Sequence, residues 1–160
     1  LPQYVERVVP YGGGGVSSGW RSELHIIDGT LRGQRYAEKM VRECISNRRD
    51  AVGQENFIFL DDNARAHRAA VVMEALEELQ INHLPLPPRS PDLNAIEHVW
   101  DLLQRQLDNH LPHPTTIREL TEILPIAFNE ISQDQIDNCI RSMSKRCQAV
   151  VNARGNTTRY

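Results

Sequence analysis

The sequence predicts a mixed α/β protein in which helices flank a sheet to form three layers. Short apolar runs of strand length alternate with longer segments whose apolar residues recur at helical spacing. The composition agrees, since 40% hydrophobic and 24% charged residues among 160 are typical of one folded domain. No apolar run approaches the roughly 18 residues of a membrane span, so no membrane partner is expected.

Three apolar runs are predicted as strands. Residues 57–60 (FIFL) form an unbroken apolar run, which is typical of a strand covered on both faces. Residues 24–27 (LHII) and 83–86 (HLPL) are shorter candidates, each stopped by a turn or proline signal. Residues 1–22 are predicted to be irregular, because glycines occupy positions 12–15 without a break.

The remaining segments have the 3.6-residue periodicity of amphipathic helices. A proline-containing break at 112–114 separates the last two from the others. The predicted helices span residues 34–46, 64–79, 94–109, 115–128 and 133–150.

Two carboxylates stand at the ends of predicted elements. Asp62 follows the 57–60 strand, and Glu97 belongs to the first turn of the 94–109 helix, with 34 residues between them. Sites in open α/β sheets form at the carboxyl ends of strands, so the two side chains are expected to meet. Hard divalent cations take oxygen ligands of this kind, and two-metal phosphoryl-transfer sites are built from them.

A purely structural explanation of the same residues stays open. Asp62 or Asn63 can cap the 64–79 helix, since both residue types accept the first-turn N–H groups. Asn94 and Glu97 have the spacing of a capping box. Asp61 competes with Asp62 as a metal ligand, because it ends the same strand.

The segments DDNARAH and SPDLNAIEHVWDLLQRQL resemble the second and third active-site segments of mariner-type transposases, which belong to the DDE superfamily. The family's 34-residue gap between its second and third acids is met by Asp62 and Glu97, and Ala95 stands where proline is usual. The glycine run, the IIDGTL phrase and the terminal SMSKRCQAVVNARGNTTRY also look like family segments. The resemblance therefore spans nearly the whole chain.

This resemblance implies a ribonuclease-H-like fold and an enzyme that cleaves DNA strands and transfers them during DNA integration. Asp62 and Glu97 would be the catalytic metal ligands for Mg²⁺, or Mn²⁺ as a substitute, with two ions in the complete site. Residues that would support these ligands are Asp61, Asn63, His67 and Asn94. The implied partners are transposon-end and target DNA and a second copy in a homodimer, and the implied location is nuclear.

Two departures from the family pattern shape the expectations for this chain. The first acid and an N-terminal helix-turn-helix region would lie upstream of Leu1, so residues 1–160 are expected to be a partial catalytic domain, a fragment or decayed copy, with 112–160 as its C-terminal helical part. Only VSSG follows Gly15, where the family has a longer apolar strand. The sheet is therefore expected to be incomplete at its N-terminal strands, with about three strands remaining, and the isolated chain to be inactive on DNA.

The net charge of −3 argues against a free-standing nucleic-acid binder. Arg141, Lys145 and Arg146 are nevertheless weak candidates for phosphate contacts, although a solvated helix face explains them as well. Two other functions stay open: a host-retained, non-catalytic DNA- or protein-binding domain derived from a transposase, and a ribonuclease-H-like nuclease acting on RNA–DNA hybrids. The long SPDLNAIEHVW match favours the transposase over the nuclease.

Overall fold

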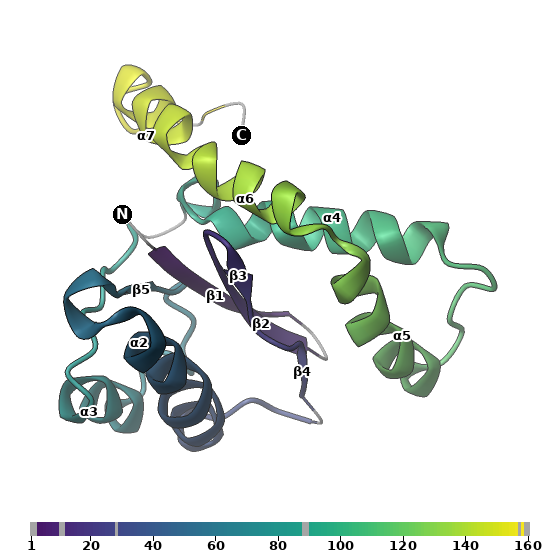
Figure 1. Cartoon of the computed structure of the whole chain (residues 1–160), viewed down its shortest axis with the longest axis horizontal. Helices are drawn as coiled ribbons and strands as arrows, with labels where there is room; N and C mark the ends of the chain where they lie inside the picture. The colour runs from purple at the N-terminus through teal and green to yellow at the C-terminus, as the bar shows by residue number, and fades with distance from the viewer. Residues whose placement is uncertain (1–2, 10–11, 28, 88–89, 157, 159–160) are drawn as a thin grey trace.

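The computed structural model describes residues 3–9, 12–27, 29–87, 90–156 and 158, with residues 3–9 and 12 as backbone only. A sheet lies between two groups of helices, which gives the three layers that the sequence predicted (Figure 1). One group consists of α1 (Gly33–Tyr36), the π-helix η1 (Ala37–Ile45), α2 (Ser46–Val52) and α3 (Ala70–Glu78). The other consists of α4 (Ala95–Asn109), α5 (Ile117–Glu130) and α6 (Gln133–Arg141).

The sheet of the described residues has five strands in the order β3-β2-β1-β5, with β4 also paired to β2. Their bounds are β1 (Gln3–Val9), β2 (Gly12–Ser17), β3 (Trp20–Arg21), β4 (His25–Ile26) and β5 (Ile58–Leu60). Strand β1 runs antiparallel to β2 and parallel to β5. The sheet is therefore mixed, and β5 lies at the opposite end of this order from β3.

The prediction of an irregular segment over 1–22, and of a sheet reduced to three strands, is wrong. The glycines of β2 pair with β1 on one side, and Gly12 and Gly13 also pair with β4 on the other. Consecutive glycines are a turn signal in isolation, but strand pairing on both sides holds them extended here. Close approach is one reason for glycine in a strand: a Cβ added to Gly14 would lie 3.3 Å from Ser22 Oγ.

The strand predicted over 83–86 is also absent from the described residues. This segment makes only an isolated bridge beside β5. Phe59 N–H donates to Asn82 O, and Leu84 N–H donates to Phe59 O, both at 2.8 Å. The pairing does not continue beyond this single bridge in the described residues.

The helices follow the predicted periodicity more closely than the strands do. Helix α4 begins one residue after its predicted start, and the segment expected over 34–46 extends to Val52 as α1, η1 and α2. The helix predicted from residue 64 begins only at Ala70. The C-terminal part consists of α5, α6 and α7 (Met143–Asn152), with α6 and α7 meeting at Ser142. None of the described helices is long and apolar enough to cross a membrane.

Strand β5 contributes to a separate core on each face of the sheet. Phe59 is fully buried among side chains of η1 and α3, which include Met40, Val41, Val72 and Leu76. Leu60 packs instead in the core built on α4, α5 and α6, with Val99, Trp100, Leu103 and Phe128. Because successive strand residues face opposite sides, the residues that follow Leu60 are divided between these two faces as well.

Candidate active site

A pocket of about 160 Å³ lies where the chain leaves β5 and where α4 begins. Asp62 and Glu97, the two carboxylates predicted to meet, both line it. The other lining residues are Leu86, Pro87, Ser90, Pro91 and Asn94. Two acidic residues with 34 residues between them in the chain thus line one small cavity.

The carboxylate of Asp62 is held in a tight turn after β5. Its Oδ1 accepts a 3.0 Å hydrogen bond from Ala64 N–H and lies 2.8 Å from His67 Nδ1. The imidazole of His67 is buried and stacks on the ring of Tyr36, with 4.2 Å between ring centroids. Asp62 keeps 21% of its side chain exposed, so it can reach the pocket while one oxygen is fixed.

Glu97 is presented by the first turn of α4, and Asn94 is the residue that caps this helix. The expected capping box does not form, because the Asn94 side chain makes no cap hydrogen bond. Its amide is 1% exposed, and neither Oδ1 nor Nδ2 has a hydrogen-bond partner among the described residues. The other capping alternative also fails, since α3 begins at Ala70 and neither Asp62 nor Asn63 caps it.

Asp61 is fully buried and points to different partners. Its Oδ1 lies 2.7 Å from Arg68 Nη2 and accepts a 2.9 Å hydrogen bond from Asn63 N–H, while Oδ2 lies 3.2 Å from His83 Nε2. Burial raises the pKa of Asp61, but the bond from His83, the Asn63 N–H and the charge of Arg68 outweigh it and hold that pKa below its usual value. Asp61 is therefore an ionised carboxylate paired with a cation.

This pairing bears on the competition between Asp61 and Asp62 for a metal. One ligand atom from each of Asp61, Asp62 and His67 lies within 4.8 Å of the others, and no other such group occurs in the described part of the chain. Arg68 already pairs with Asp61, whereas Asp62 lines the pocket together with Glu97. Sequence reasoning missed Arg68 and His83, because nothing in their spacing marks them as partners of Asp61.

Asn63 links the end of β5 to the wall of the pocket. It adopts a left-handed backbone conformation with φ of 59°, and its Nδ2 donates a 2.6 Å hydrogen bond to Leu86 O. Asparagine tolerates this conformation better than most residues. Asn63 therefore has a structural reason to follow Asp62.

The three basic candidates are in different environments. Lys145 is exposed, and Arg141 is exposed but donates a 2.9 Å hydrogen bond to Asn138. Arg146 is 2% exposed and donates to the carbonyls of Asp92 and Cys139, both at 3.5 Å. The guanidinium of Arg146 thus fastens α7 to the turn before α4, and its phosphate contact stays a prediction.

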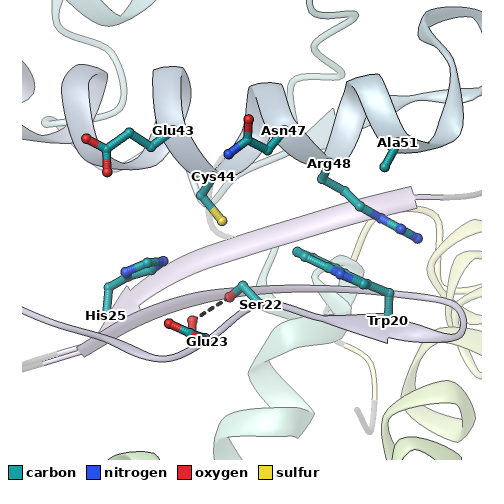
Figure 2. Close-up of a pocket in the computed structure, with 9 residues that line it drawn as sticks. All are labelled: Trp20, Ser22, Glu23, His25, Glu43, Cys44, Asn47, Arg48 and Ala51. Carbon is teal, nitrogen blue, oxygen red and sulfur yellow. Dashed lines mark hydrogen bonds between the residues drawn. The ribbon is translucent and has the colours of Figure 1, made fainter.

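A larger groove of about 390 Å³ lies between η1–α2 and the part of the sheet formed by β3 and β4 (Figure 2). The Arg48 guanidinium lies 4.7 Å from the centroid of the Trp20 ring and donates a 3.1 Å hydrogen bond to Ser17 Oγ. Two acids line this groove, Glu23 and Glu43, and they extend from its opposite walls (Figure 2). Asp62 and Glu97 line the smaller pocket and do not line this groove.

Comparison with known proteins agrees with this geometry. The family model described as DDE superfamily endonuclease matches residues 17–120. The Tcb1 transposase of Caenorhabditis briggsae is 30% identical over 165 residues, which cover 99% of this chain and 59% of that protein. The Tc1 transposase of Caenorhabditis elegans is 35% identical over 104 residues, covering 65% of this chain and 37% of that one. The chain thus spans less than two thirds of the length of these relatives.

Solved structures show the same fold. The Mos1 transposase catalytic domain, solved with raltegravir and Mn, superposes with a TM-score of 0.79 at 19% identity, covering 98% of this chain and 84% of that one. A pre-cleavage Mos1 transpososome gives a TM-score of 0.76 at 18% identity, covering 92% and 44%. The ribonuclease-H-like fold and the resemblance to mariner-type transposases are both confirmed. Because the family model covers about two thirds of its residues, this chain belongs to the DDE superfamily endonucleases, a class of enzymes that act on DNA.

Proposed function

We propose that this chain is the catalytic part of a DNA transposase, and that Asp62 and Glu97 hold the divalent cations on which DNA strand cleavage and strand transfer depend. One observation supports this most directly: both residues line a single pocket at the end of β5. Their oxygens suit Mg²⁺, with Mn²⁺ as a substitute. The Mos1 catalytic domain has itself been solved with Mn and with Mg.

A bound cation would lower the pKa of an attacking water and stabilise the charge on the leaving oxygen. The residues of the chain supply its ligands and keep them in place. Ala64 N–H and His67 hold one oxygen of Asp62, which limits rotation of its carboxylate. Glu97 stands in the first turn of α4, where the helix N-terminus stabilises an ionised acid.

DNA is proposed as the substrate, both as transposon ends and as target, and a homodimer as the working assembly. The Mos1 pre-cleavage transpososome and the Mos1 paired-end complex with a left transposon end support these two proposals. The match covers 44% of the chain in the pre-cleavage transpososome and 59% of Tcb1. A nuclear location is proposed with them, because a chromosomal target lies there.

The test asks whether Mg²⁺ strengthens or weakens DNA binding by the chain. Fluorescence anisotropy of a short labelled duplex is measured with and without Mg²⁺ for the wild type, Asp62→Asn and Glu97→Gln. Cations ordinarily weaken association by competing for phosphates. An ion shared between the carboxylates and a phosphate reverses this sign, so wild-type binding should strengthen, and binding by Asp62→Asn and Glu97→Gln should not. Glu130→Gln, exposed at the end of α5, is the matched control and should behave like the wild type.

Equal weakening by Mg²⁺ in the wild type and in both variants would overturn the metal-dependent function and favour a non-catalytic DNA-binding domain. Strand cleavage by residues 1–160 alone is expected to be undetectable, because a net charge of −3 attracts phosphates poorly and two carboxylates balance only one divalent ion. Metal-dependent cleavage that Glu97→Gln abolishes would contradict that expectation and support the reaction itself.

A further inference from the structure

Asn94 has a buried amide that the fold of the protein does not explain. The residue precedes α4, and its side chain would ordinarily accept an N–H from the first turn, yet it makes no such bond. It is 1% exposed, and neither of its amide atoms has a hydrogen-bond partner in the described part of the chain. An unsatisfied buried polar group costs about 1–3 kcal/mol, so a ligand for this amide is to be expected.

The surroundings of the amide indicate what that ligand is. Asn94 lines the same pocket of about 160 Å³ as Asp62 and Glu97. An amide oxygen is a good ligand for hard divalent cations, as carboxylate oxygens are. The two carboxylates balance the charge of one such ion, and the neutral amide adds an oxygen without adding charge. The positive end of α4 opposes a cation, so the amide could not hold one without the two acids.

We propose that Asn94 is a third protein ligand, and that its Oδ1 binds the same divalent cation as Asp62 and Glu97. The inference rests on the proposed function, since it assumes the metal site of that reaction. It adds a ligand from the helix cap, and it assigns Nδ2 to donate to a water or a phosphate oxygen beside the ion. In the absence of DNA, these three residues bind one ion per chain.

The turn that carries Asn94 is fastened from the C-terminal side. Asp92, in the turn η3 (Pro91–Leu93), accepts hydrogen bonds from Arg146 Nη1 to its carbonyl at 3.5 Å and from Thr158 Oγ1 to Oδ2 at 3.1 Å. These contacts hold the backbone two residues before Asn94. A ligand on a restrained backbone loses little freedom on binding the metal, which favours affinity.

The experiment measures Mn²⁺ binding by isothermal titration calorimetry, with urea unfolding of the metal-free protein beside it. Asn94→Ala is expected to weaken binding about tenfold or more, as loss of a metal-site partner does. The same variant should be as stable as the wild type or more stable without metal, because it removes an unsatisfied amide. Asn94→Asp should bind Mn²⁺ at least as tightly as the wild type, since it keeps the oxygen and adds charge. Asn109→Ala, exposed at the other end of α4, is the control and should change neither measurement.

The outcomes separate this inference from the proposed function. Unchanged affinity in Asn94→Ala, with binding lost in Asp62→Asn, would overturn the amide ligand and leave the proposed metal site standing. Equal weakening in Asn94→Asp and Asn94→Ala would also overturn it, because a carboxylate is an equivalent oxygen donor. Absence of any divalent binding by the wild type, or binding that Asp62→Asn leaves unchanged, would instead overturn the proposed function.

Discussion

Asp61 and Asp62 are neighbours in the chain, but the two faces of the sheet treat them differently. Asp61 follows Phe59 in the alternation of the strand and is fully buried beside Arg68 and His83. Asp62 follows Leu60, whose core is built on α4, and it lines the pocket with Glu97. One carboxylate is paired with a cation inside the fold, and the other lines the pocket, where Ala64 N–H and His67 contact one of its oxygens.

At the end of β5, Asp61 thus stabilises the fold, and its neighbour Asp62 lines the candidate site. A buried carboxylate with a cation and two hydrogen-bond donors anchors the turn, because removal of any partner leaves a charge uncompensated. Asp62 instead lines the pocket that Glu97 and Asn94 also line. The buried carboxylate of Asp61 is therefore directly beside the candidate metal ligand Asp62.

The largest expected effect on the free energy of unfolding comes from removing the buried carboxylate of Asp61. Asp61→Ala should lower the free energy of unfolding by about 3 kcal/mol, because it leaves Arg68 and His83 without their buried carboxylate. Asp62→Ala, its neighbour, should lower the same quantity by less, about 1 kcal/mol, because it removes the hydrogen bond from Ala64 N–H. Urea denaturation of both variants measures the contrast, and similar losses in the two would break the comparison.

The next effect comes from adding and removing the metal. Mn²⁺ at a hundred times its dissociation constant should stabilise the wild type by about 2.7 kcal/mol relative to a chelator. Asp62→Asn should abolish this stabilisation, and Asp61→Asn should retain most of it once its lower basal stability is subtracted. Thermal unfolding with Mn²⁺ or with EDTA tests both variants. A greater loss in Asp61→Asn would show that the metal binds on the other face.

The pH dependence of stability sharpens the comparison further. The pKa of Asp61 in the folded state lies below its usual value, so its ion pair contributes stability above about pH 4, the pKa of an unfolded aspartate. That contribution should be lost as the pH falls through the lower folded pKa. Unfolding by urea at pH 5 and at pH 3 should show a smaller acid loss in Asp61→Asn than in the wild type. An equal loss would mean that Asp61 is not the group responsible.

The smallest effect is expected away from both carboxylates. Lys145 is exposed on α7, so Lys145→Ala should weaken duplex DNA binding only about two- to threefold and reduce the salt dependence by about one phosphate contact. Stability should not change. Anisotropy titrations over a range of salt concentrations measure both quantities, and an unchanged salt dependence would remove Lys145 from the DNA contacts.

Much of the site could be predicted from residues that are close in the chain. The apolar stripe of α4 and the unbroken run before Asp61 are local patterns, and they located Glu97 at a helix start and Asp62 at a strand end. The family segments around them supplied the expectation that the two acids would meet, and both line one pocket. Helices were predicted well because their periodicity depends on residues three and four positions apart.

Only the tertiary structure decided the rest. The glycine run became part of β2 because β1 on one side and β4 on the other pair with it. Pairing of β5 with the segment at 82–84 brought His83 beside Asp61. Asn94 had the spacing of a helix cap, but its side chain makes no cap hydrogen bond, and the residue lines the pocket instead. In each case a side chain or a backbone group has several local partners of similar energy, and contacts with residues distant in the sequence select among them.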